Sequence, residues 1–476
     1  DRGGCAPRPV YLHPHLHLPT PGRVAQRLEH SPYTRRVPGS NPGLPIPHSR
    51  NRAMNALDLA YLPIAALTAP FWARKQRSGW SERFGRITPV PSRPGQNRIL
   101  IHAVSVGEVS ALRHLIPLLT PHAHIIISVG TDTGITRARE LFSTTCDIVR
   151  YPLDASWAVR RFLDAVRPDA VALVELELWP NFIRACNNRK IPVCIINGRL
   201  SARSFKGYSR LRFFFRPLFS SLKFAAVQDA DYAKRFEHMG VAPNDCLITG
   251  SMKWDAAKIE DSVSGAPHLA AELGLSRDIP LIVAGSTGPG EEALLHAAVS
   301  AVEKDLGPIQ LLCAPRKPER FNEAAQALGP GCTRRSAKEP APRGTTRFLL
   351  DTIGELRAAY SLADLVIVGR SFGDLFGSDP IEPIALGKPT IIGPAVSDFA
   401  QIVGAFESAR GIARATRESL PALFRQLLSD PAARHRLAHN GREVITRMQG
   451  ASSRHAELLL HLAAITPQSP EHARIS

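Results

Sequence analysis

The chain has 476 residues, which is too long for one compact domain and suits two or three. Its apolar fraction of 44% is that of an ordinary globular protein, so sizeable cores can form. The 59 Lys and Arg exceed the 42 Asp and Glu, and this net charge of +17 indicates anionic partners, with a basic solvated surface as the alternative. Aromatic residues make up only 7% and show no base-stacking pattern, which argues against nucleic acid as the partner.

The first 53 residues are unlike the rest of the chain. Residues 1–53 hold ten prolines and eight arginines and show neither helical nor strand periodicity. Residues 23–43 resemble a peptide that arises when a transfer-RNA gene is translated by mistake. We therefore expect Met54 to be the true start and residues 1–53 to be non-native, with a disordered basic tail as the alternative.

The next segment, residues 54–78, is predicted to be a membrane anchor. Its apolar stretch is about 16 residues long, whereas a spanning helix needs roughly 20. Tyr61, Trp72 and a basic flank after them favour a shallow or interfacial anchor with the basic flank on the cytoplasmic side. A buried N-terminal helix is the alternative.

Short apolar runs then alternate with helical patterns, such as the one from Val109 to Leu119, which predicts parallel sheets buried on both faces. The expected strands are 99–104, 125–128, 171–174, 191–196 and 224–228, then, after a break at 255–278, 280–284, 309–314, 348–350, 365–368 and 390–392. Two such sets predict an α/β protein with two Rossmann-like, doubly wound domains that face a central cleft. We place them at 79–256 and 277–430, joined by a linker at 257–276. A C-terminal helical segment, residues 431–476, continues a helical pattern over 417–462 and is expected to pack back on the first domain.

The seven cysteines are scattered, without a CxxC pair or an accompanying histidine cluster. This spacing predicts neither a zinc site nor a disulfide framework, and no other metal site is expected. Cys194 and Cys313 lie inside apolar runs, where reduced core thiols are the simplest interpretation. The compartment is therefore expected to be reducing and cytosolic.

Carboxylates follow two of the strands in the first half. Glu108 lies where a helix begins after the strand at 99–104, and such a residue can accept a proton from an acceptor hydroxyl or simply complement the helix dipole. Glu175 and Glu177 follow the strand at 171–174 and share one face if the strand geometry persists. They suggest a base or an acceptor of sugar hydroxyls, with a salt-bridged strand end as the alternative.

The second half carries small, basic and acidic motifs at the ends of its strands. The turn 285–292 offers a helix N-terminus as a phosphate seat, although it lacks the Gly-Lys-Ser of a P-loop. Arg316 and Arg320 suit phosphate or carboxylate. Thr352 and Glu355 fit a capping box, which alone would explain them. A glycine-rich loop leads to Glu382, which is suited to the ribose hydroxyls of a nucleotide.

Eight motifs in this order resemble the 3-deoxy-D-manno-octulosonic acid (Kdo) transferases of lipopolysaccharide assembly over about residues 54–450. They are Ser105-Val-Gly-Glu108, Glu177-Leu-Trp-Pro-Asn181, Arg199-Leu-Ser-Ala-Arg-Ser-Phe205, Gly250-Ser-Met-Lys-Trp-Asp255, Gly285-Ser-Thr287, Pro315-Arg316, Asp351-Thr-Ile-Gly-Glu-Leu356 and Glu382-Pro383. The resemblance implies a GT-B fold, CMP-Kdo as donor, a lipid A precursor as acceptor, and inversion without a metal or other cofactor.

The resemblance also assigns roles to residues. Glu108 is implied as the base on the acceptor hydroxyl. Glu177, on its position after the strand at 171–174, is predicted as a further catalytic residue. The CMP seat is implied at Ser286, Thr287, Arg316, Gly354, Glu355, Ser371 and Glu382, with Lys253 as a cation near the phosphate or the Kdo carboxylate. An anionic inner-membrane surface is the further expected partner.

Three positions depart from the family pattern, in which they are histidines. They are Gly288, Lys317 and Ser378. All three lie on the donor side, which leaves open a transferase that uses a different donor sugar. A nucleotide-sugar epimerase with a GT-B-like fold is the other alternative, and it would need neither a lipid acceptor nor the anchor.

Overall fold

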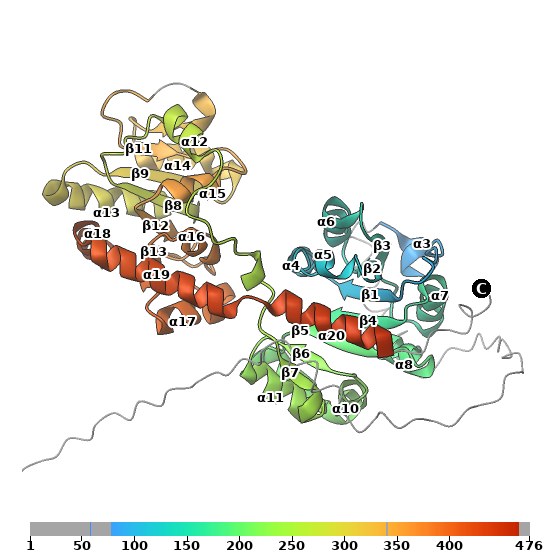
Figure 1. Ribbon diagram of the computed structural model, residues 1–476. Coiled ribbons are helices and arrows are strands. Elements are labelled where there is room, and N and C mark those ends of the chain that lie inside the picture. The colour runs from blue at the N-terminus through green and yellow to red at the C-terminus, as the bar shows by residue number, and fades with distance from the viewer. Residues whose placement is uncertain (1–57, 59–77, 339–340, 466–476) are drawn as a thin grey trace, which may run out of the picture. The chain divides into compact units, whose positions relative to one another are not determined.

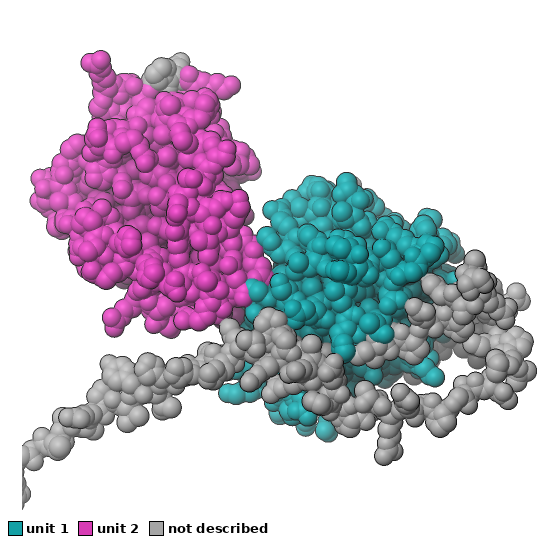
Figure 2. All heavy atoms as spheres, in the orientation of Figure 1, with its two compact units in different colours: residues 1–252, 450–476 teal, residues 253–449 magenta. Residues whose placement is uncertain are grey.

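The structure, a computed structural model, describes residues 58, 78–338 and 341–465 (Figure 1). The chain forms two compact units, residues 1–252 with 450–476 (unit 1) and residues 253–449 (unit 2), coloured separately in Figure 2. Residues 1–53 and most of the expected anchor at 54–78 lie outside the described residues. Within the described ranges, no helix is both long and apolar enough to cross a membrane.

Unit 1 contains a parallel sheet in the order β3-β2-β1-β4-β5-β6-β7 (Figure 1). Its strands are β1 (Arg98–Ala103), β2 (His124–Val129), β3 (Asp147–Arg150), β4 (Ala170–Val174), β5 (Val193–Gly198), β6 (Ala225–Val227) and β7 (Cys246–Ile248). The five strands expected here are confirmed. The patterns missed β3 and β7, because each is short and β3 begins and ends with a charged residue, Asp147 and Arg150, so it gives no continuous apolar run.

Helices cover both faces of this sheet. They are α3 (Trp80–Arg83), α4 (Val106–Ala111), α5 (Ile116–Leu119), α6 (Asp132–Phe142), α7 (Ser156–Val166), α8 (Pro180–Asn188), α9 (Ala202–Arg210), α10 (Arg212–Ser220), α11 (Ala230–Met239) and α20 (Ala451–Ile465). Alternate β1 residues enter two separate cores: Ile99 and Ile101 join one, and Leu100 joins the other. The single helix expected over 109–119 is two helices, because Pro117 lacks the N–H that an unbroken helix would need.

Unit 2 repeats the plan with the strand order β10-β11-β9-β8-β12-β13-β14, again parallel. Its strands are β8 (Leu281–Thr287), β9 (Gln310–Pro315), β10 (Thr333–Arg334), β11 (Arg347–Leu349), β12 (Leu365–Val368), β13 (Thr390–Ile392) and β14 (Ala413–Arg414). Its helices are α12 (Ala266–Leu273), α13 (Glu291–Leu306), α14 (Phe321–Leu328), α15 (Leu356–Leu362), α16 (Ile381–Ala385), α17 (Ala400–Ser408), α18 (Leu420–Ser429) and α19 (Pro431–Met448). The strands expected from the sequence in this half are confirmed.

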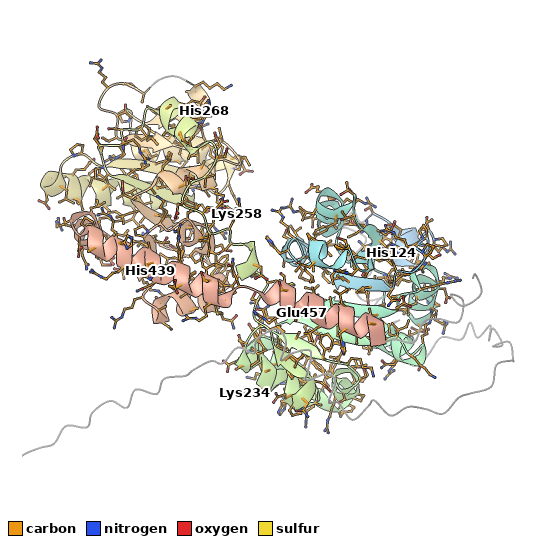
Figure 3. All side chains as sticks on the ribbon, viewed as in Figure 1. His124, Lys234, Lys258, His268, His439 and Glu457 are labelled. Carbon is orange, nitrogen blue, oxygen red and sulfur yellow. The ribbon has the colours of Figure 1, made fainter. Side chains whose placement is uncertain are left out.

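The chain returns to unit 1 at its end. The expected continuous helix over 417–462 is three helices, and the last break falls at Gly450, whose φ of 94° suits glycine. Figure 3 labels His439 on α19, in unit 2, and Glu457 on α20, in unit 1. Helix α20 contacts β1, β4 and β5. Its buried His455 accepts a hydrogen bond from the Asn197 amide at 2.7 Å, which joins this helix to the end of β5.

Six cysteines, all but Cys5, lie in the described part of the chain, and each is a free thiol. Cys194 and Cys313 are fully buried core residues, as their apolar surroundings predict.

Candidate active site

The two acidic motifs of unit 1 meet at one point of its sheet. The strand order reverses direction between β1 and β4, which are neighbours, and ligands of open α/β sheets bind beyond the carboxyl ends of strands at such a switch point. Glu108 follows β1 and Glu177 follows β4. The fold thus brings together two carboxylates that are 69 positions apart in the sequence.

Glu108 is held by the start of α4. Ser105 is the N-cap residue, and its Oγ accepts from the Glu108 amide at 3.3 Å and donates to Glu108 Oε1 at 2.8 Å. The Val104 amide donates to Glu108 Oε2 at 2.8 Å. The carboxylate therefore has one fixed orientation, at a helix N-terminus whose dipole favours its negative charge.

Glu175 and Glu177 do not continue the strand. β4 ends at Val174, and Glu175 has a φ of 60°, in the left-handed region. The strand geometry on which the expected shared face depended therefore does not persist, because this turn breaks the alternation. Beyond the turn, the Trp179 indole donates from Nε1 to Glu177 Oε2 at 3.0 Å.

The surroundings of Glu177 disfavour its charge. Partial burial is the main reason that its pKa rises from the usual 4.5 to about 7, and the negative charge of Glu108 adds to the rise. The hydrogen bond from Trp179 acts in the opposite direction. Two carboxylates that repel each other in this way are suited to proton transfer near neutral pH.

The helix that follows this acidic loop is fixed by two further carboxylates. Asp154 accepts from the Asn181 and Phe182 amides at 3.0 and 2.9 Å, which satisfies the first turn of α8. The buried Asp58 accepts from Asn181 Nδ2 at 3.2 Å and from the Ser156 amide at 2.8 Å. Asp58 belongs to the segment expected to be an anchor, so this residue joins that segment to the start of α8.

The donor-side motifs of unit 2 lie at the equivalent switch point, between β8 and β12. The Gly369 amide donates to the Gly285 carbonyl at 2.8 Å, so the two loops leave the sheet side by side. A Cβ on Gly369 would lie 2.6 Å from the Thr287 Cα, and one on Gly285 would overlap the ring of Tyr360. Only glycine allows this close approach.

The turn expected to be a phosphate seat is filled by the protein's own carboxylates. Glu291 accepts from the amides of Gly288, Arg370, Ser371 and Phe372, at 2.7 to 2.9 Å. Glu292 accepts from the buried Thr287 hydroxyl at 2.5 Å and pairs with Arg320 at 2.8 Å. The internal anion Glu291 thus organises the loop. This role was not predicted, although the Gly-Glu-Glu run after a small-residue turn was a signal for it.

Three other expected donor-side residues have structural partners. The buried Ser371 hydroxyl donates to the Val368 carbonyl at 2.6 Å and accepts from the Gly393 amide at 2.8 Å. Glu355 pairs with Arg335 at 3.1 Å. It is the N-cap residue of α15, so the expected capping box from Thr352 to Glu355 is wrong, although the Thr352 hydroxyl does donate to that carboxylate. Gly354, with a φ of 98°, is exposed.

Arg316, Lys253 and Glu382 remain exposed or half-exposed at this end of unit 2. Buried Tyr360 lies near two of them: burial raises the pKa of its hydroxyl, the charge of Glu382 adds to the rise, and Arg316 opposes it. Glu382 itself pairs with Arg357 at 3.5 Å. Burial raises the pKa of the Glu382 carboxyl, and the charge of Arg357 opposes the rise. Burial raises the pKa of Asp379, and the charge of nearby Lys253 opposes that rise.

Within the described ranges, no group of three His, Cys, Asp or Glu side chains is arranged to hold a metal ion.

The family scan matches both halves of the chain. Residues 78–256 match the family described as 3-deoxy-D-manno-octulosonic-acid transferase (kdotransferase), and residues 334–444 match glycosyl transferases group 1. The 3-deoxy-D-manno-octulosonic acid transferase of Haemophilus influenzae is 31% identical over 411 residues, which cover 85% of this chain and 95% of that relative. The chain belongs to the Kdo transferase family. It is a glycosyltransferase.

Further relatives agree with this assignment. The Kdo transferase of Bordetella pertussis is 32% identical over 82% of this chain and 94% of its own. A glycosyltransferase from Rickettsia africae, 10% identical, superimposes with a TM-score of 0.51 over 80% of this chain and all of that one. That structural likeness shows the fold, and with the two parallel sheets it confirms the expected two-domain GT-B architecture.

Against the usual Kdo transferase pattern, the three replaced histidines fall in different surroundings. A Cβ on Gly288 would lie 2.8 Å from the Leu375 Cδ1, so a side chain there needs that leucine to move. Lys317 is exposed, whereas Ser378 is buried and its hydroxyl has no hydrogen-bond partner among the described residues.

Proposed function

We propose that this protein transfers Kdo from CMP-Kdo to a lipid A precursor, with inversion at the anomeric carbon, without a bound metal and with Glu108 as the general base. The observation that carries the proposal is the pairing of Glu108 and Glu177 at the switch point of unit 1. Family membership supports the class of transferred sugar.

The acceptor hydroxyl would lose its proton to Glu108 as its oxygen attacks the anomeric carbon. The carboxylate is suited to this because Ser105 and Val104 hold both of its oxygens in a fixed orientation. A positioned base of this kind contributes roughly 10²–10⁴-fold to the rate. Glu177, whose pKa lies about 7, would share that proton with Glu108 and help to orient the sugar.

The departing CMP carries a phosphate whose negative charge grows as the glycosidic bond breaks. Arg316, which is exposed after β9, and Lys253 are the cations proposed to stabilise that charge. Glu382, at the start of α16, is proposed to accept the ribose hydroxyls. Ser286, Gly354 and the backbone near them complete the proposed CMP seat; the Thr287, Glu355 and Ser371 side chains would act mainly by holding its shape, because each is bonded within the protein.

A lipid acceptor places the reaction at a membrane surface. The proposed location is the cytoplasmic face of the inner membrane, with residues 54–78 as the anchor. The net charge supports this location even without residues 1–53, whose eight Arg and two acidic residues contribute +6 of the +17, because anionic lipid and phosphorylated acceptors attract a basic protein.

One assay tests the proposal. The full chain is incubated with CMP-Kdo and a tetra-acylated lipid A precursor, and the mass of the lipid product is measured by mass spectrometry. A mass increment of one or more Kdo units is expected. Release of free Kdo or an epimerised nucleotide sugar without a lipid product would refute the proposed acceptor, and activity only with another nucleotide sugar would refute the proposed donor.

A further inference from the structure

Helices α9 and α10 of unit 1 expose large apolar side chains. Phe213 is 82% exposed and Leu211 is 53% exposed. Their neighbours point inward: the Tyr208 and Phe215 rings meet edge to face at 4.7 Å, and Phe219 is fully buried. The helix pair therefore has one aromatic side that belongs to the core and another that the described part of the protein leaves uncovered. Adjacent exposed apolar side chains of this size mark an interaction surface.

The charge on the two helices that carry this apolar face has one sign. From Leu178 to Gln228 the chain contains no Asp or Glu. The same stretch contains ten basic residues, namely Arg184, Arg189, Lys190, Arg199, Arg203, Lys206, Arg210, Arg212, Arg216 and Lys223. Arg203, Lys206, Arg210 and Arg216 are exposed on α9 and α10 themselves.

We propose that this surface docks onto an anionic lipid bilayer. The docking surface is defined by six residues, Arg203, Lys206, Arg210, Leu211, Phe213 and Arg216. Leu211 and Phe213 enter the boundary between the headgroups and the acyl chains, and the four cations meet lipid phosphates. Exposed apolar side chains flanked on the same two helices by cations fit this partner, because a bilayer offers an apolar interior beneath a layer of negative charge.

The docking surface adjoins the acidic site. Helix α9 starts shortly after β5, which is the neighbour of β4 in the sheet, and so leaves the same edge as the loop of Glu177. Glu177 is near enough to Tyr208 on α9 to raise the pKa of that phenol, in addition to the effect of burial. Docking here would bring the carboxylate pair to the depth at which a lipid-linked sugar hydroxyl lies, and this part of the inference rests on the proposed function.

The test measures the binding of the full chain to vesicles that contain no sugar acceptor. One set holds phosphatidylglycerol and phosphatidylethanolamine, and the other holds phosphatidylcholine alone. Leu211→Ser with Phe213→Ser is expected to lower the partition coefficient for anionic vesicles by about tenfold or more. Arg210→Glu with Arg216→Glu is expected to lower it by more than about fivefold per charge, with an effect that shrinks at high salt.

Two matched controls separate the docking surface from general surface chemistry. Leu118→Ser with Leu306→Ser removes apolar side chains of about 40% exposure elsewhere, and Lys304→Glu with Arg436→Glu makes the same charge change on unit 2. Both controls are expected to bind vesicles like the unchanged protein. Melting temperatures check that every variant is folded.

Three results would overturn the inference: anionic vesicles that bind no better than phosphatidylcholine, docking variants that bind like the controls, or a soluble protein that covers Phe213 in place of lipid. The proposed function fails separately. The docking variants should keep their turnover on acceptor dispersed in detergent, so a chain that binds vesicles through this surface but transfers no Kdo would refute the activity and leave the surface standing.

Discussion

Ser105 and Glu108 bond to each other in both directions: the Ser105 hydroxyl donates to the Glu108 carboxylate, and the Glu108 amide donates to Ser105 Oγ. This reciprocal pair caps the start of α4, two residues after the last residue of β1. Glu108 thus stabilises the start of α4 and, in the proposed mechanism, also accepts the proton of the acceptor hydroxyl. The two roles can be separated because they respond to different measurements.

Replacing Glu108 with Gln is expected to lower kcat by at least about 100-fold, because the amide cannot accept the proton of the acceptor hydroxyl. CMP binding, measured by calorimetry, should stay unchanged. The loss of one accepted hydrogen bond should cost only about 1 kcal/mol of stability. Glu140→Gln, an exposed carboxylate on α6, is the control. Turnover near that of the control would refute the base assignment.

Glu177→Gln is expected to stabilise the protein at high pH. The folded-state pKa of Glu177 is about 7, above the usual 4.5, so the folded state holds the extra proton between these values and loses stability as the pH rises through them. At about pH 8 the variant should gain about 1–3 kcal/mol, and near pH 4.5 the gain should vanish. Thermal melts at both pH values measure this, and an equal effect at the two would contradict the raised pKa.

Glu382→Ala is expected to weaken CMP binding about tenfold or more, because it removes the acceptor proposed for the ribose hydroxyls. Isothermal titration of CMP measures the change. Glu443→Ala, an exposed carboxylate on α19, should leave the affinity as it was. An unchanged Kd in Glu382→Ala would remove this residue from the nucleotide site.

His455→Ala is expected to destabilise the protein by about 2–4 kcal/mol, because it opens a cavity and leaves the buried Asn197 amide without its acceptor. The control is His439→Ala on α19, whose side chain is exposed (Figure 3). Denaturant unfolding compares the two variants. Equal stability would show that α20 does not depend on this buried contact for its attachment to unit 1.

The strands could be read from the sequence where they are fully buried on both faces. Ile99 to Ala103 forms an unbroken apolar run apart from His102, and runs of this kind predicted the central strands of both sheets. Short edge strands such as β10 and β14 have two residues each and little burial, so their patterns carry no comparable signal. Helix ends were harder, because single residues such as Pro117 and Gly450 decide them.

The sequence also predicted only part of the candidate site. Glu108 and Glu177 could be named because each follows a predicted strand, but their mutual repulsion depends on β1 and β4 being neighbours. The function of Glu291 as an internal anion was not predicted, because most of its partners are amides about 80 positions away, and the Gly-Glu-Glu run names no partner. The positive φ of Glu175, which ends the strand geometry after Val174, has no signal in the sequence.

The sequence by itself determined that this chain is a two-domain α/β protein, that it resembles the Kdo transferases, and that Glu108 begins a helix after a strand. Those properties are local, because burial periodicity and short motifs are written within a few consecutive residues. Only the tertiary structure decided which carboxylates lie together, which carboxylates bond to the protein's own amides and which apolar side chains stay exposed. These outcomes depend on strand order and on contacts between distant segments, which no single stretch of sequence contains.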